Sequence, residues 1–446
     1  MAEVMLDKGP RAEAYGQKLS RMVQKETVSW RDQQDRTKFL EFHKLLEELF
    51  PLVHRTCEKH VFDGSLLFRW QGKGAAEPIL LMSHQDVVEA NGEWSHAPFG
   101  GEMDEDGRVW GRGTVDTKAS LFCIFEAVEE LIAEGYVPEC DVYIASSCTE
   151  EWSGEGAPDT AVYLAENRIR LRLLLDEGGM VVENPIPMVQ GTYAMVGIVE
   201  KGYGDVRFTA RSKGGHASVP GTNTPLVRLG KFMADVDKKS PFKVQYTPVV
   251  EEMFRRIAPN MNWFMRILFS HPGAFRPLLE KILPAASPAA AAMLRTTIAF
   301  TMAKGSDGAN VLPQEASVVA NMRFIHHQPN QESIECIRRI ADKYDIETEV
   351  IYQDAPCPIV DLKGEAFRLV EDVVHEVYPG VEVCPYVMTG GTDAKYYKDI
   401  CDNCIRFAPL YIDVQQYGSI HGLDENIYQG TLPMGVDFYK KIIKRS

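Results

Sequence analysis

Short apolar runs alternate with longer amphipathic stretches in the first part of the chain, and a further amphipathic stretch follows near its end. Runs with the length and composition of buried strands occupy residues 65–70, 79–82, 142–147 and 171–175. Apolar residues at helical spacing predict helices within residues 12–60, 117–132 and 364–377. Because strands alternate with helices, we expect an α/β domain built on a mostly parallel sheet.

A second pattern begins after the strand at 171–175. Strands are predicted over residues 195–211, 315–324 and 348–352, with helices from residue 224 and over residues 330–343. Strand, helix and paired strands in this order predict a small α+β sandwich inserted into the first domain.

Several predicted strands end in groups that can bind metals or move protons. The runs at 79–82, 142–147 and 171–175 lead into His84-x-Asp86, Glu150-Glu151 and Asp176-Glu177. Ligands of open α/β sheets bind outside the carboxyl ends of the strands. Residues at i and i+2 of a strand point the same way, so His84 and Asp86 are expected to face one site.

Asp116 extends this pattern. Gly111 and Gly113 allow tight turns before it, and one aspartate can bridge two divalent cations through its two oxygens. Taken alone, Asp116 is typical of a helix cap, and an acidic pair such as Glu150-Glu151 is commonly a surface feature. In combination they favour a metal site, where one carboxylate of the pair binds a metal and the other is the general base.

Together these motifs resemble the M20 metallopeptidases, in particular the carboxypeptidase S branch with its Gly-X carboxypeptidases and N-acyl-amino-acid hydrolases. The resemblance covers nearly the whole chain and rests on Ser-His-Gln-Asp-Val-Val (83–88), Trp94 with Pro98-Phe99, Gly-Arg-Gly-Thr-Val-Asp-Thr-Lys (111–118), Glu-Glu (150–151), Asp-Glu-Gly-Gly (176–179) and Ile-His-Gly (420–422). It implies a mostly parallel-sheet zinc-hydrolase domain, formed by residues 1–197 and 355–446. A ferredoxin-like α+β lid and dimerisation domain would occupy residues 198–354.

The resemblance also implies a dinuclear zinc site in each subunit. Asp116 would bridge both metals, and the remaining ligands would be His84 and Asp176 for one metal and Glu151 and His421 for the other. Glu177 competes with Asp176 for its place, although spacing from Glu151 favours Asp176. Oxygen and imidazole donors without cysteine also suit Co²⁺ or Mn²⁺.

Further roles follow from the same resemblance. Glu150 would be the general base, Asp86 would orient the site, and His216 would reach a neighbouring active site across a homodimer to stabilise the oxyanion. Arg323 would bind a substrate carboxylate. Weaker candidates for substrate contact are Asn310, Gly391 and Thr392, the last two in a Gly-rich loop that is otherwise typical of a capped turn.

Composition narrows the class of partners. The net charge of −15 argues against nucleic acid as a binding partner, because proteins that bind the phosphates of nucleic acid neutralise them with an excess of Lys and Arg. No run approaches the roughly 20 apolar residues of a membrane span, so no membrane partner is expected. Nine cysteines at scattered spacing, with no secretory signal at the start, predict free thiols and a cytoplasmic location.

The apolar stretch within residues 241–303 is longer than a bare lid requires. Its stripe of Met, Trp and Phe at helical spacing predicts core or dimer interface, and an apolar substrate wall is the alternative.

Our working hypothesis is zinc-dependent hydrolysis of a peptide or N-acyl amide next to a free carboxylate, the chemistry of a carboxypeptidase or dipeptidase. An aminoacylase, or an N-acyl-amino-acid hydrolase or synthase, is the close alternative. A metal-binding scaffold without catalysis is the remote one, and the intact Glu150 argues against it.

Overall fold

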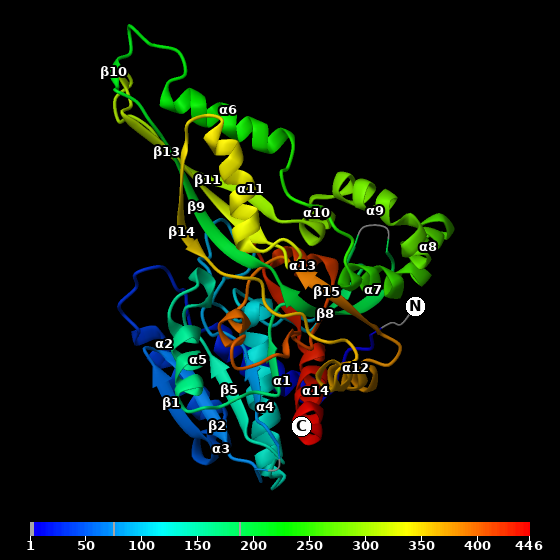
Figure 1. Ribbon diagram of the computed structural model, residues 1–446. Coiled ribbons are helices and arrows are strands. Elements are labelled where there is room, and N and C mark those ends of the chain that lie inside the picture. Colours follow the sequence, from blue (N-terminus) through cyan, green and yellow to red (C-terminus); the bar gives the residue numbers. More distant parts are fainter. Residues whose placement is uncertain (1–3, 75, 187–188) are drawn as a thin grey trace.

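The main body of the protein is a ten-stranded sheet covered by helices. The computed structural model describes residues 4–74, 76–186 and 189–446 (Figure 1). In chain order the strands of this sheet are β1 (Glu58–Phe62), β2 (Ser65–Trp70), β3 (Ile79–Met82), β5 (Val142–Ser146), β6 (Leu173–Asp176), β7 (Val181–Glu183), β8 (Thr192–Glu200), β15 (Glu382–Met388), β16 (Cys404–Arg406) and β17 (Tyr411–Ile412). The helices of the body are α1 (Pro10–Val23), α2 (Thr37–Leu49), α3 (Pro51–Thr56), α4 (Ala119–Ala133), α5 (Gly156–Glu166), α12 (Glu365–Val377), α13 (Val414–Ser419) and α14 (Leu432–Arg445).

The centre of the sheet is parallel, as the sequence predicts. Strands β5, β3, β6 and β16 are neighbours in that order and run in one direction. On both sides of this centre antiparallel pairs are added, β2 with β5 and β16 with β8. The sheet is therefore mixed, and its parallel part holds the strands that end in acidic groups.

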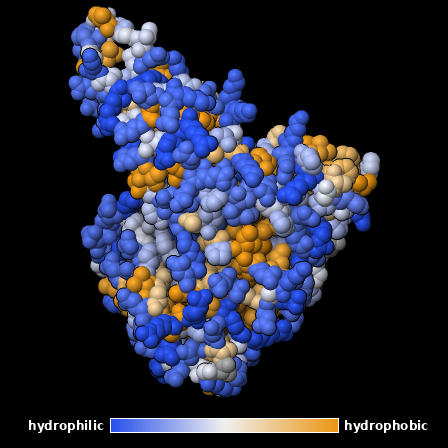
Figure 2. All heavy atoms as spheres, viewed as in Figure 1, coloured by the Kyte–Doolittle hydropathy of each residue, from blue (hydrophilic) through white to orange (hydrophobic). Residues whose placement is uncertain are grey.

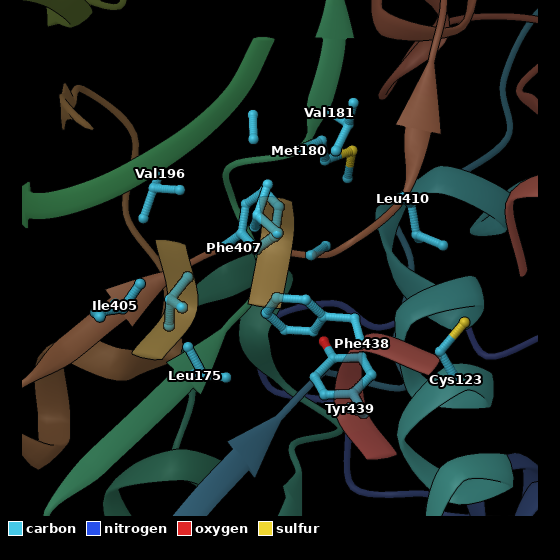
Figure 3. Close-up of a cluster of buried hydrophobic side chains, with 14 of the residues drawn as sticks. Cys123, Leu175, Met180, Val181, Val196, Ile405, Phe407, Leu410, Phe438 and Tyr439 are labelled. Carbon is cyan, nitrogen blue, oxygen red and sulfur yellow. The ribbon is translucent and has the colours of Figure 1, made fainter. Parts of the chain in front are cut away.

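Both faces of the central strands β3, β5 and β6 are buried, which explains why these strands are continuous apolar runs. In β3, Ile79 and Leu81 join the larger hydrophobic cluster, whereas Leu80 and Met82 join a separate cluster on the opposite face. Figure 3 shows the larger cluster between the strands and helices α4 and α14, where the rings of Phe407 and Phe438 lie 5.5 Å apart.

The second unit is a four-stranded antiparallel sheet with order β11-β13-β9-β14. Its strands are β9 (Gly202–Arg211), β11 (Thr297–Lys304), β13 (Glu315–Phe324) and β14 (Glu347–Gln353), and its helices are α6 (Pro225–Lys238) and α11 (Asn330–Asp342). The chain order βαββαβ is the predicted ferredoxin-like one. Residues along β13 alternate between buried and partly exposed, so the two helices cover one face of this sheet.

The border between the two units differs from the predicted one. The stretch 195–211 is two strands rather than one, because β8 remains in the large sheet as far as Glu200 and β9 starts the second sheet at Gly202. The sequence predicts the border at residue 198, which lies inside β8. Lys201 is the residue at which the chain changes sheets.

A four-helix insert also departs from the predicted division. Helices α7 (Pro248–Ile257), α8 (Trp263–Ser270), α9 (Pro272–Ala286) and α10 (Pro288–Leu294) lie between α6 and β11 in the chain. Their buried side chains belong to the core of the main body, and Arg256 of α7 donates to the carbonyl oxygen of Val383 in β15 at 2.8 Å. The core role predicted for this stretch is confirmed for Met253, Phe254, Leu268 and Phe269, which join the core of the body, whereas Trp263, Phe264 and Ile267 are exposed.

Among the residues that the structure describes, no helix combines the length and apolarity needed to cross a bilayer.

Candidate metal centre and active site

Parallel strand order brings the predicted site residues to one edge of the large sheet. Strand β3 lies between β5 and β6 and runs parallel to both. The residues that follow these strands therefore meet at their carboxyl ends. The sequence motifs separated by up to a hundred residues become neighbours there.

Asp116 lies between two imidazoles. Its Oδ1 is 2.9 Å from Nε2 of His84, and its Oδ2 is 3.1 Å from Nε2 of His421. His421 Nε2 is also 3.2 Å from Oε2 of Glu151. Ligand atoms of His84, Asp116 and Glu151 all lie within 4.8 Å of one another. Each oxygen of Asp116 thus faces a different histidine.

A buried glutamate shapes the loop that carries Asp116. Glu425 is fully buried, and its carboxylate accepts hydrogen bonds from the backbone N–H groups of Gly113, Val115 and Asp116 at 2.8–3.0 Å. Arg112 also donates to it at 2.7 Å. Gly113 has φ of 85°, a conformation that glycine adopts without strain. The tight turn inferred from the sequence is confirmed.

Asp86 holds His84 and the turn after β5. The backbone oxygen of Asp86 lies 2.9 Å from Nδ1 of His84, which places a proton on Nδ1 and leaves the Nε2 lone pair for a metal. The Asp86 carboxylate accepts from Ser29 and from the backbone N–H groups of Glu150 and Glu151. Asp86 thus contacts one imidazole and the backbone of two glutamates, and its orienting role in the site stays a prediction.

The pKa values of the site reflect its crowded charges. Burial raises the pKa of Asp116, but hydrogen bonds from His421 and His84 outweigh burial and hold that pKa below its ordinary value. Hydrogen bonds to Asp116 and Glu151 raise the pKa of His421 to about 10. Burial, together with the charges of neighbouring acids, raises the pKa of Glu150 well above its usual range. Once ionised, a carboxylate whose pKa is raised is a stronger base.

Asp176 and Glu177 are held differently. Both oxygens of Asp176 accept backbone N–H groups, from Ala394 at 2.8 Å and from Glu177 at 2.9 Å. Burial and the charge of Asp116 raise the pKa of Glu177 well above its ordinary value, so the Glu177 carboxyl lies within the field of the cluster. The next residues, Gly178 and Gly179, lie where side chains would collide with Met388 and with the backbone of β8.

The donor set fits divalent cations. Burial raises the pKa values of several carboxyls here, namely Glu150, Glu151, Asp176, Glu177 and Asp393, the last to about 8. Two imidazoles cannot neutralise that many acids, whereas bound divalent cations would. Imidazole and carboxylate donors suit Zn²⁺, Co²⁺ or Mn²⁺.

His216 and Asn310 lie away from this cluster. His216 is in β10 (Gly215–His216), which pairs with β12 (Val311–Leu312) at the far tip of the second unit (Figure 1). The backbone oxygen of Asn310 accepts from Ala217 at 2.9 Å. Ser218 N–H donates to Nδ1 of His216 at 3.1 Å, which keeps a proton on Nε2 in the neutral ring. His216 is exposed at this tip.

Arg323 lies beside the Gly-rich loop, together with a lysine that sequence reasoning missed. A side chain built on Gly391 would come within 3.4 Å of the Arg323 guanidinium and 3.9 Å of Lys395 Nζ. Both cations lie over the ring of Tyr203. Among the described residues neither has an ion-pair partner, since the neighbouring Glu200 pairs with Arg406 at 3.1 Å. Lys395 directly follows the Gly-rich loop that contains Gly391 and Thr392, in the sequence Gly-Gly-Thr-Asp-Ala-Lys. Its position next to that loop is the feature of the sequence that could have identified it.

Thr392 has a structural role as well as its predicted one. Its hydroxyl accepts from the backbone of Ala394 and donates to Glu200 at 3.2 Å. It therefore caps the short helix over Asp393–Tyr397, as the alternative interpretation has it, and its contact with substrate remains a prediction.

An apolar cavity of about 320 Å³ adjoins the cluster. Gly178 and Ile420, which are neighbours of Glu177 and His421 in the chain, form part of its wall. The insert supplies most of the rest, and the lining includes six methionines, Met180, Met195, Met253, Met261, Met265 and Met293. Methionine side chains adapt to ligands of variable shape. The apolar wall considered from the sequence is present, but its methionines follow no spacing that would predict a shared cavity.

Fold and site together define a metal-dependent hydrolase. The model of peptidase family M20/M25/M40 matches residues 80–445, and the chain belongs to this family. Probable carboxypeptidase S-like 2 from Dictyostelium discoideum is 30% identical over 445 residues, which cover 96% of this chain and 84% of that protein. The human N-fatty-acyl-amino acid synthase/hydrolase PM20D1 is 29% identical over 443 residues, which cover 97% of this chain and 88% of that protein.

Solved structures share the fold at lower identity. The M20 family metallo-carboxypeptidase Sso-CP2 from Sulfolobus solfataricus superposes with a TM-score of 0.69 at 16% identity, and 96% of this chain and 98% of that one are covered. The dipeptidase Dug1p from Saccharomyces cerevisiae has a TM-score of 0.68 at 15% identity, and 97% of this chain and 96% of that one are covered. The expected α/β class and the M20 resemblance are confirmed, and the chain is a hydrolase of the M20 type.

Proposed function

We propose that this protein hydrolyses an amide bond next to a free carboxylate, in a peptide or an N-acyl amino acid, with two zinc ions in each subunit. The observation that carries the proposal is the division of the Asp116 carboxylate between His84 and His421. A carboxylate whose two oxygens serve different imidazoles suits a bridge between two cations. Co²⁺ or Mn²⁺ would fit the same donors.

Two further ligand positions complete this proposal. Glu151 would share one cation with His421, as their distance of 3.2 Å supports. Either Asp176 or Glu177 would join His84 on the other. The metal content of Asp176→Asn and Glu177→Gln would decide between them, since only loss of the true ligand lowers the zinc content.

The chain's own residues would carry the proton transfers. Bound cations would supply polarisation of the amide carbonyl and a more acidic water. Glu150, whose pKa is already raised by burial, takes the proton from the attacking water and passes it to the leaving nitrogen. The backbone N–H of Glu150 is fixed by Asp86 at 3.2 Å, which keeps the base oriented.

Two cations are candidates for the substrate carboxylate. Arg323 and Lys395 converge at Gly391, where the absence of a side chain leaves room. A guanidinium fork binds a carboxylate in two places, and Lys395 would add a point charge. Lys395 is only 9% exposed. Its Nζ donates to the Ser153 hydroxyl at 3.4 Å but has no ion-pair partner among the described residues, so a carboxylate bound there would neutralise its charge.

A second copy of the chain would complete the site. His216 lies at the tip of the second unit, away from its own metal cluster (Figure 1). We therefore propose a homodimer in which each subunit lends His216 to the oxyanion of its neighbour. Asn310, on the strand connection next to His216, would accompany it. Residues 202–211, 225–238 and 297–353 would serve as lid and dimerisation unit, with the insert belonging to the catalytic body.

The cavity favours a substrate with an extended apolar group. Its six methionines and few polar atoms suit an aliphatic acyl chain or a large apolar side chain. It lies next to Glu177 and His421, where an acyl group would point away from the carboxylate anchor. An N-acyl amino acid therefore fits the site at least as well as a peptide, and the same site could run the reverse condensation.

All nine cysteines are free thiols, which supports the proposed cytoplasmic location, because that compartment is reducing.

The test is product analysis by mass spectrometry. Zinc-loaded protein would be incubated with dipeptides, N-blocked dipeptides and N-acyl amino acids of increasing chain length, beside Glu150→Gln and the exposed control Glu139→Gln. We expect cleavage by wild type and Glu139→Gln and none by Glu150→Gln, with zinc retained in all three. Release from peptides alone would identify a carboxypeptidase, and release from N-acyl amino acids alone an aminoacylase. Full zinc content without cleavage of any amide would refute the proposal and leave a metal-binding scaffold.

A further inference from the structure

Helices α8 and α9 expose apolar side chains on the surface of the four-helix insert. On α8, Trp263 is 75% exposed, Phe264 57% and Ile267 48%. Leu278 and Ile282, one turn apart on α9, are also exposed. Hydrophobic residues gather at the end of the molecule that Figure 1 assigns to α8 and α9 (Figure 2). We call these five residues the insert patch.

The opposite faces of the same helices are already buried. Leu268 and Phe269 of α8 belong to the core, and the ring of Phe269 stacks on Phe254 at 4.2 Å. Leu279 and Leu283 of α9 are buried as well. Both helices therefore bury one apolar face against the body and expose further apolar side chains elsewhere, as helices do that are surrounded by protein or placed in a lipid interface. Burial against the body accounts for only one of the two faces.

The charge around the insert patch is opposite to that of the chain as a whole. Residues 263–286 carry Arg266, Arg276 and Lys281 against the single acid Glu280, whereas the whole chain has a net charge of −15. Apolar side chains with Trp and Phe, bordered by Arg and Lys, are the composition of helices that lie in the plane of an anionic membrane surface. A symmetric contact between two copies would instead set these cations against each other.

The insert patch is also next to the apolar cavity. Met265 and Phe269, interleaved in α8 with Phe264 and Ile267, line the cavity. Leu283 lines it too and adjoins Ile282 of the patch. Helices α8 and α9 thus separate the cavity from the insert patch. An amphiphile held in a lipid layer under α8 and α9 would have a short path to the cavity.

We propose that helices α8 and α9 dock on the surface of an anionic lipid layer, with Trp263, Phe264 and Ile267 inserted among the acyl chains and the basic residues at the headgroups. This function goes beyond amide hydrolysis and stands without it, because docking requires no turnover. It revises the expectation from the sequence that no membrane takes part, since an interfacial helix needs no membrane span.

The experiment is co-sedimentation of the zinc-loaded full chain with vesicles. One vesicle preparation contains phosphatidylcholine alone, and the other contains phosphatidylcholine with phosphatidylglycerol. We expect binding to the anionic vesicles, weakened about ten-fold or more in the triple variant Trp263→Ser, Phe264→Ser, Ile267→Ser, because three inserted side chains are lost. The double variant Arg266→Gln, Lys281→Gln should weaken binding to anionic vesicles by about ten-fold and leave the weaker binding to neutral vesicles unchanged.

The control places serine at three other exposed apolar positions, Leu40, Val61 and Val162, and should bind as the wild type does. Absence of binding by the wild type, or equal loss in the control, would overturn the proposal. A change of oligomeric mass in the patch variant without vesicle binding would show that a second copy covers the patch. Circular dichroism and zinc content establish that each variant is folded, and cleavage of a short, fully soluble substrate should be unchanged in the patch variant. Failure of hydrolysis in the wild type would leave the vesicle result standing.

Discussion

Replacing Glu425 with glutamine tests how the fold prepares the metal site. Glu425 is fully buried and accepts four hydrogen bonds, two at each carboxylate oxygen. Oε1 serves Val115 and Asp116, and Oε2 serves Arg112 and Gly113. Glutamine has the same shape but one acceptor oxygen, so two of these donors must face an NH₂ group. The charge that opposes Arg112 is lost in addition.

The size of the effect follows from these contacts. A buried donor without its acceptor costs about 1–3 kcal/mol, and breaking a buried ion pair from one side costs about 3–5 kcal/mol. Arg112 keeps a bond to the carbonyl of Gly422 at 2.8 Å and a stacking contact with Trp94, which moderates its loss. We expect the free energy of unfolding to fall by about 3 kcal/mol.

The assay is urea unfolding followed by circular dichroism, with zinc affinity measured by titration calorimetry. The control is Glu139→Gln, which removes an exposed ion pair with Lys73 and should change stability by less than about 1 kcal/mol. Because Glu425 holds the backbone of Asp116, zinc affinity should fall by about ten-fold or more in Glu425→Gln. Stability within about 1 kcal/mol of the wild type, with unchanged zinc affinity, would refute the reasoning.

Three shorter predictions complete the set. Burial lowers the pKa of His43 from 6.5 to about 4. Between these pH values the unfolded chain binds a proton that the folded chain does not, so the free energy of unfolding decreases as the pH falls. His43→Gln should reduce this difference in stability, measured by urea unfolding at about pH 5 and pH 7. Ala290→Phe should fill part of the cavity that Ala290 lines and raise KM for long acyl chains while KM for acetyl substrates stays unchanged; equal effects on both would argue against the cavity as an acyl site. Lys395→Met should raise KM about ten-fold for substrates with a free carboxylate and should not affect their carboxamide analogues, a difference that steady-state kinetics would measure.

The strands of the site could be predicted because both of their faces are buried. Ile79–Met82 alternates between two clusters, so every residue is apolar and the run stands out in the sequence. His84, Asp116 and Glu150 follow such runs or glycine turns, which made them candidates before the structure placed them together. These residues could be predicted from the local sequence because each of them follows a strand or a glycine turn at the edge of the sheet where ligands bind.

The change of sheet at Lys201 could not be predicted in the same way. Strand β8 is mostly apolar, β9 alternates between buried and partly exposed residues, and a single residue separates them, so nothing in the local pattern marks the border. The reason for the break lies elsewhere in the chain, since a side chain on Gly202 would collide with the carbonyl of Asp354, where the chain returns. Glu425 and Lys395 were missed for a similar reason. The hydrogen-bond partners of Glu425 lie 309 to 313 residues away, and Lys395 lies over Tyr203, which is far from it in the chain, so no local sequence pattern indicates these contacts.

The way the second unit joins the body bears on how the proposed site would work. The two crossing segments are hydrogen-bonded to each other, by Asp354 N–H to the carbonyl of Tyr203 at 2.7 Å and by Cys357 N–H to that of Glu200 at 3.2 Å. Arg323 pairs with Tyr203 in the second sheet, so it lies beside this junction, whereas His216 lies at the far tip. Rotation of the unit about the junction would therefore move His216 much more than Arg323. In the proposed homodimer, an anchor near the pivot would hold the substrate carboxylate through opening and closing, while the proposed oxyanion donor would arrive only on closure.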